Sequence, residues 1–260
     1  MTQRYEFTVG ARPSLDVRAN AGSVEIVAAT DGVIAVAVDH PDRWDVSNVG
    51  DAVSVEPVER RGRRSGRLAI EVPPGTRVEF KSASADLRVE GDLGTFVAST
   101  ASGDLRLHGR CESVRLSTAS GDLRCLAVDG DLEAASVSGD LDATEIGGRV
   151  EITTTSGDAR IGRLDGDASI KSTSGDVRIG RADGNEYSIR TISGDVRIAL
   201  PSGIRVVPEL TTFSGTTRLP EPRRDAGEDA GGGPRRVVHL RIKSVSGDIE
   251  IQRAEPGRVS

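Results

Sequence analysis

The stretch 99-STASGDLRL-107 returns almost unchanged as 117-STASGDLRC-125, so the octapeptide STASGDLR occurs twice in full. Its tripeptide SGD recurs with an 18-residue period, beginning at Ser102, Ser120, Ser138, Ser156 and Ser174. A variant, SAD, begins one period earlier at Ser84, and later copies begin at Ser193, Ser214 (as SGT) and Ser246. Self-similarity at one period is the signature of a repeat architecture.

Each period contains two short stretches in which apolar residues alternate with others. With the Ser of the tripeptide as position 1, positions 4 and 6 are mostly apolar, as in Leu105 and Leu107. Positions 13 and 15 are also apolar, as in Val114 and Leu116. Alternation of this kind predicts strands with one buried face, and glycine recurs too often for helices.

Two strands cannot bury their own apolar face, whereas stacked copies cover one another. We therefore predict an all-β fold, a right-handed single-stranded parallel β-helix (β-solenoid) with 18-residue rungs, stacked about 4.8 Å apart. Left-handed hexapeptide solenoids need an apolar residue at every sixth position. Position 10 contains Asp129, Gly147 and Asp165, which favours the right-handed form.

The repeated Gly and Asp are predicted to be structural turn residues. Gly adopts positive φ at little steric cost, and Ser and Asp hydrogen-bond to backbone groups within turns. The predicted turn residues are Gly103, Asp104, Gly121, Asp122, Gly139, Asp140, Gly157, Asp158, Gly175, Asp176, Gly194, Asp195, Gly247 and Asp248.

Three columns of polar side chains follow from stacking these turns. The Asp residues of position 3 and the Arg residues of position 5 share strand parity and are expected to point outward as neighbouring ladders. Asp142 interrupts the Arg column. The hydroxyl residues of position 17, such as Thr118 and Ser136, are expected to face inward near the corner.

The chain divides into two regions by this repeat. Residues 1–80 lack SGD but contain strand-like stretches, and they are predicted to form an N-terminal cap continuous with the solenoid. Residues 81–252 are predicted to form the SGD-repeat solenoid, with a Gly-rich, charged, flexible loop at 220–236. Pro256, soon after 248-DIEI-251, is expected to blunt the C-terminal edge.

Composition and charge narrow the class of protein. The net charge of −6 and the pI near 5.3 argue against nucleic acid as a partner. No segment reaches the roughly 20 apolar residues of a membrane span, and 1-MTQRYEFTVGARPSL-15 lacks the features of a signal peptide. We expect a cytoplasmic protein, with association to the cell envelope left open. Cys111 and Cys125 are expected to be free thiols.

The chain resembles a bacterial family of β-strand-repeat proteins called putative adhesins, whose domain has no assigned function. The resemblance rests on serial SGD followed by DLRL, DVRI or DIEI, and on the turn 72-VPPGTRVEF-80 before the first repeat. It covers roughly residues 4–252. More distantly, the chain is similar to toast-rack and bactofilin-type β-solenoids. The resemblance implies a solenoid and offers no catalytic residues.

We predict a non-enzymatic structural or interaction module that binds a protein partner or self-associates. Asp and Arg occur in nearly every rung, so no rung stands out as a catalytic site, and GxSxG, HExxH and P-loop motifs do not occur. No catalytic, cofactor-binding or metal-binding residues are predicted. Two alternatives stay open: a calcium-binding repeat protein, since Asp recurs about every nine residues, and a carbohydrate-active β-helix enzyme.

Overall fold

The computed structural model describes residues 2–29, 31–58, 66–220 and 236–254, most of which lie in β-strands. A single 3-10 turn, Pro41–Arg43, is the only helical element in these ranges. The strands are β1 Gln3–Thr8, β2 Ser14–Ala28, β3 Val33–Val38, β4 Trp44–Val49, β5 Ala52–Pro57, β6 Arg67–Val72, β7 Arg77–Glu90, β8 Leu93–Ser102, β9 Leu105–Ser120, β10 Leu123–Val128, β11 Leu132–Ser138, β12 Leu141–Ile146, β13 Val150–Ser156, β14 Ala159–Leu164, β15 Ala168–Ser174, β16 Val177–Ala182, β17 Glu186–Ser193, β18 Val196–Leu200, β19 Arg205–Ser214, β20 Thr217–Arg218, β21 Val237–Ser246 and β22 Ile249–Arg253.

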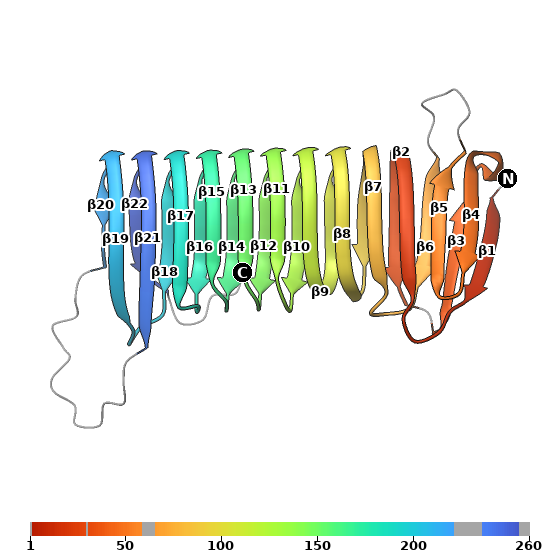
Figure 1. Ribbon diagram of the computed structural model, residues 1–260, viewed down its shortest axis with the longest axis horizontal. Coiled ribbons are helices and arrows are strands. Elements are labelled where there is room, and N and C mark those ends of the chain that lie inside the picture. The colour runs from red at the N-terminus through yellow and green to blue at the C-terminus, as the bar shows by residue number, and fades with distance from the viewer. Residues whose placement is uncertain (1, 30, 59–65, 221–235, 255–260) are drawn as a thin grey trace.

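The strands lie side by side in a long stack, with β1 near one end and β19 and β20 at the other (Figure 1). Each rung supplies one strand to each of two parallel ladders. Ladder A contains the strands before each Ser-Gly-Asp corner, such as β11, β13, β15 and β17. Ladder B contains the strands after it, such as β10, β12, β14 and β16. The longer strands β2, β7 and β9 bend between the ladders and belong to both.

The register of both ladders follows the repeat of the sequence. In ladder B, Leu141 lies between Leu123 and Ala159, and in ladder A, Ile152 lies between Ala134 and Ile170. Neighbours across the ladder are thus one full period of the sequence apart. This confirms the all-β parallel solenoid with 18-residue rungs, while the right-handed sense stays a prediction.

The core is the narrow space between the two ladders. Alternate residues of most strands point into it, and side chains such as Leu105, Leu132 and Ile170 are almost fully buried. Each such side chain contributes about 1.5–3 kcal/mol through burial. Few aromatic residues enter the core, and the buried ones are Trp44, Phe80, Phe96 and Tyr187. A thin core of aliphatic side chains explains how a 260-residue chain manages with 3% aromatic residues.

Reversed strands close the N-terminal end. In ladder B, β6 is parallel to β2, but β3 runs antiparallel to β6 and β1 antiparallel to β3. In ladder A, β5 is parallel to β2 and β4 is antiparallel to β5. The parallel stack therefore begins with β5 and β6, inside residues 1–80. The outermost strands run antiparallel to their neighbours. A further rung of the parallel repeat would therefore not match their hydrogen-bonding pattern.

The C-terminal end has an order that differs from the order of the chain. β21 lies between β17 and β19, and β22 lies between β18 and β20. The last rung of the sequence is therefore the next-to-last rung of the rod. The expectation that the strand before Pro256 forms the C-terminal edge was wrong, because β20 covers β22. Pro256 and nearly all of the predicted loop at 220–236 lie outside the described residues.

Candidate functional site

The glycines of the Ser-Gly-Asp corners form a column in which each touches the next. Their φ angles lie between 128° and 151° at Gly103, Gly121, Gly139, Gly157, Gly175, Gly194 and Gly247. A Cβ atom on Gly139 would lie 2.2 Å from the carbonyl oxygen of Gly121 in the preceding rung. Only glycine meets both conditions, so the repeat of glycine records the close approach of stacked backbones as well as the corner itself.

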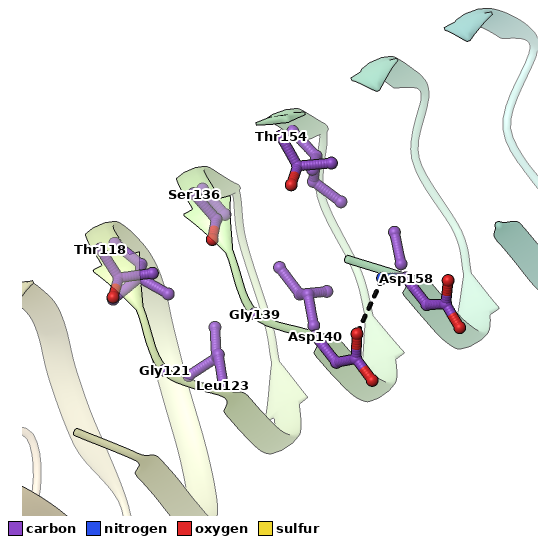
Figure 2. A pocket seen from close by; sticks show the side chains of 13 residues that line it. Thr118, Gly121, Leu123, Ser136, Gly139, Asp140, Thr154 and Asp158 are labelled. Atoms are coloured by element: carbon purple, nitrogen blue, oxygen red, sulfur yellow. Dashed lines mark hydrogen bonds between the residues drawn. The ribbon is translucent and has the colours of Figure 1, made fainter. Parts of the chain in front are cut away.

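The Asp side chains of the corners join successive rungs. The N–H group of Asp158 donates to Oδ1 of Asp140 at 2.9 Å (Figure 2). The same bond recurs along the rod, with acceptors Asp104, Asp122, Asp158, Asp176, Asp195 and Asp248. The sequence interpretation placed these bonds within one turn, and the structure corrects it. Each carboxylate reaches across to the backbone of the neighbouring rung.

The second carboxylate oxygen pairs with the Arg ladder. Arg106 contacts Oδ2 of Asp104 at 2.7 Å, and Arg197 contacts Oδ2 of Asp195 at 2.9 Å. Where Asp142 interrupts the Arg column, Arg160 of the next rung reaches back to Asp140 at 3.4 Å. These half-exposed pairs are weak individually, but they offset the repulsion between stacked charges of one sign.

The corner carboxylates are thus occupied by donors that the protein itself supplies. A hard cation would need several carboxylate or carbonyl oxygens turned toward one point. Within the described ranges, no group of three or more His, Cys, Asp or Glu side chains has an arrangement that could hold a metal ion. The corner geometry supports a structural role for the repeated Asp.

The outer face of ladder A has a different surface at its C-terminal end. Position 16 supplies three cations on consecutive rungs, Lys171, Arg190 and Lys243, which lie next to one another in the ladder. Position 18 supplies Ile192, Val245 and Phe213, whose side chains are 53%, 51% and 91% exposed. We call these six residues the basic–apolar strip.

The cations of the strip are poorly neutralised. Lys243 lies 3.6 Å from Glu209, which also binds Arg241 at 2.9 Å. In the part of the chain that the structure describes, Lys171 and Arg190 have no acidic side chain within 4.0 Å. Like charges stacked side by side repel, so this column destabilises the folded rod. An anionic group bound to the column would offset that repulsion.

A family model, Toastrack DUF4097, matches residues 31–252. The chain belongs to the Toastrack family. The match spans both regions that the sequence distinguished, and it agrees with the resemblance to putative adhesins and toast-rack solenoids. The family is a domain of unknown function, so membership assigns no activity to the Asp, Arg or Gly columns.

Solved structures similar to this Toastrack chain share little sequence with it. A putative lipid binding protein from Parabacteroides distasonis ATCC 8503 aligns with a TM-score of 0.50 and 14% identity, over 96% of each chain. A putative adhesin from Bacteroides fragilis NCTC 9343 aligns with a TM-score of 0.46 and 14% identity, over 96% of this chain and 97% of that one. The first similarity shows the fold alone. A search of curated proteins found no match.

Two further features of the Toastrack rod bear on its chemistry. Cys111 and Cys125 are free and buried, and burial raises the pKa of each thiol to about 12. Neither thiol is therefore a nucleophile at neutral pH. No helix within the described residues is long and apolar enough to cross a membrane.

Sequence reasoning did not find the basic–apolar strip. The tripeptides at Ser193, Ser214 and Ser246 follow one another along the chain, which suggests successive rungs in that order. In the structure, Ser246 lies between the other two. This insertion brings Ile192, Val245 and Phe213 together, and only the strand order reveals it.

Proposed function

We propose that this Toastrack chain is a non-enzymatic interaction module of the adhesin type, and that its basic–apolar strip binds a protein partner with an acidic surface. The observation that carries the proposal is the unneutralised column of Lys171 and Arg190 beside exposed Ile192, Val245 and Phe213. Exposed apolar side chains rimmed by charge mark interaction sites. The rest of the rod neutralises many of its charges, for example at Arg106 and Arg197.

The flatness of the strip favours a broad partner over a small ligand. Its residues alternate along the open face of a sheet, and small-molecule sites are enclosed pockets. Two open surface hollows, one lined by Arg18 and Glu56 and the other by Glu25 and Arg67, lie near the other end. A protein surface that carries carboxylates around an apolar centre would match the strip in charge and shape.

The test compares two charge reversals of equal size on opposite faces. The strip variant is Lys171→Glu with Arg190→Glu, and the control is Arg160→Glu with Arg178→Glu on the outer face of ladder B. Polyglutamate serves as a defined acidic probe. Binding about tenfold weaker in the strip variant, and nearly unchanged in the control, supports the proposal. Equal weakening by both variants would show attraction by overall charge and would contradict a defined surface.

Vesicles of anionic lipid provide the second arm. A similar structure is named a putative lipid binding protein, and the sequence left envelope association open. If the strip variant loses vesicle binding while polyglutamate never binds the wild type, the acidic protein partner is replaced by a lipid surface. The cytoplasmic location expected from the sequence stays a prediction.

A further inference from the structure

A column of buried hydroxyl groups runs along the inside of the corner. Position 17 supplies it, and its members are at most 8% exposed at Thr100, Thr118, Thr154, Ser172, Thr191 and Ser244. This confirms that position 17 faces inward. Some of these hydroxyls donate to the carbonyl two residues later in the same rung: Thr100 to Ser102 at 3.1 Å, Thr154 to Ser156 at 3.2 Å and Thr191 to Ser193 at 3.1 Å.

Other members of the column have no such partner. The hydroxyl oxygens of Thr118, Ser136, Ser172 and Ser244 are buried without a hydrogen bond to protein. A buried hydroxyl without a partner is unfavourable, and native proteins meet most such groups with ordered water. Repeating the same deficiency along one column therefore indicates a ligand that the protein atoms alone do not supply.

The serines have a regular place in this column. Ser136 lies between Thr118 and Thr154, and Ser172 lies between Thr154 and Thr191. Each serine lacks the methyl group that its threonine neighbours carry. A serine at this position therefore fills less of the corner than the threonines of the neighbouring rungs.

The corner at Ser136 contains a small cavity. It has a volume of about 20 Å³ and is lined by Thr118, Ser136 and Thr154, by the backbone of Gly121 and Gly139, and by side chains that include Leu123. Figure 2 shows the three hydroxyl groups in step along one side of it. A cavity needs roughly 10–15 Å³ of this kind to hold a water molecule, which requires two to four polar partners.

We propose that the serine rungs of the corner bind structural water, one molecule each at Ser136, Ser172 and Ser244. The water at Ser136 bonds to the hydroxyls of Ser136 and Thr118, which explains why Thr118 does not bond within its own rung as Thr100 does. The solenoid thus has a water-binding site wherever position 17 changes from threonine to serine. This inference is independent of the proposed function of the strip.

Replacing Thr118 with Val tests the proposal through the direction in which the melting temperature changes. Valine has nearly the shape of threonine without its hydroxyl. If water is bound, Thr118→Val removes one of its hydrogen bonds and lowers the melting temperature. If the cavity is dry, the same change removes an unpaired buried hydroxyl and raises the melting temperature. Thr100→Val is the matched control, because it loses a bond to Ser102 in either case and must lower the melting temperature.

A second measurement counts the water directly. Magnetic relaxation dispersion of ¹⁷O in solution reports long-lived internal water. Ser136→Thr adds a methyl group at the cavity, and Ser172→Thr adds one beside the unpartnered hydroxyl two rungs away. We expect each variant to hold one long-lived water fewer than the wild type, with unchanged circular dichroism. An unchanged count in both variants, or a higher melting temperature for Thr118→Val, would overturn the proposal.

Discussion

At the scale of single residues, two features require glycine at the corners: a positive φ and the close approach of the backbone of the neighbouring rung. Gly139 has φ of 147°, and the carbonyl oxygen of Gly121 lies 2.2 Å from where its Cβ would be. Gly203 has φ of 82° with nothing within 4 Å of its own Cβ position. Gly203 thus has a positive φ without a backbone contact, whereas Gly139 has a positive φ and a backbone contact.

We expect Gly139→Ala to lower the free energy of unfolding by about 2–5 kcal/mol, because it adds a clash with fixed backbone to the conformational strain. Gly203→Ala should cost about 1 kcal/mol, since only the φ preference is lost. Chemical denaturation of both variants checks this. Similar losses in the two would show that stacking contributes nothing at the corner.

The buried thiols give a second prediction at this scale. Burial raises the pKa of Cys111 and Cys125 to about 12, so almost no thiolate is present at pH 8. We expect iodoacetamide to label neither cysteine in the folded rod and both after unfolding in guanidinium. Rapid labelling of the native protein at pH 8 would contradict the burial of the two thiols.

At the scale of elements, the terminal strands depend on few contacts. β20 pairs only with β22 among the described strands, and the N–H group of Thr216, just before β20, donates to Oδ1 of Asp248 at 2.8 Å. This bond lowers the pKa of Asp248. A lowered pKa in the folded state means that the ionised carboxylate contributes stability above its unfolded pKa of about 3.9, and that this contribution is lost as the pH falls through the folded value.

We therefore expect the end rung to loosen first in acid. Thermal melts between pH 2 and pH 7 should show a smaller loss of stability on acidification for Asp248→Asn than for the wild type, because the amide keeps an acceptor without titrating. Asp45→Asn, at an exposed carboxylate of β4 near the far end, is the control for removing a single carboxylate elsewhere on the rod. An identical acid dependence in wild type and Asp248→Asn would contradict this role.

The insertion of β21 and β22 makes a further prediction about elements. Deleting residues 237–260 removes a rung from within the stack, and β19 then loses the strand with which it pairs. We expect the amides of β19 to lose hydrogen-exchange protection in this variant, while those of β13 and β15 keep theirs, because repeats contact only their neighbours. Retained protection of β19 would show that it pairs elsewhere.

At the scale of the whole molecule, both ends discourage continued stacking. Reversed strands end the parallel stack at the N-terminal end, and at the other end a proline lies on β19, the outermost strand of ladder A. The N–H group of Arg205 points toward the interior of the stack and donates to the carbonyl oxygen of Arg236 at 2.9 Å. N–H groups alternate in direction along a strand, so the N–H groups of the even-numbered residues of β19 point to its free edge. Residue 208 is one of these positions, and as a proline it has no N–H group. Proline on an exposed edge is a common protection against edge-to-edge pairing.

We expect the rod to be a monomer. Light scattering on a size-exclusion column should give one mass, near 27.3 kDa, over a hundredfold range of concentration. Pro208→Val, which restores the N–H group at the edge, should promote assembly, while Val207→Thr on the same strand should not. Growth of the wild type into long species would contradict the closure of the ends and favour self-association.

The structure of a single rung could be derived from the sequence. Period, alternation and the recurring Gly and Asp predicted an all-β solenoid of 18-residue rungs, because each rung repeats the same local contacts with the next. Only the tertiary structure shows three further features: the order of the rungs, the partners of the corner hydrogen bonds and the surface at the C-terminal end. With β21 between β17 and β19, Ser246 still lies in register with Ser193 and Ser214. The corners therefore align although the rungs do not follow the order of the chain. A repeat makes its rungs nearly interchangeable, so the spacing of SGD copies does not reveal which rung lies beside which.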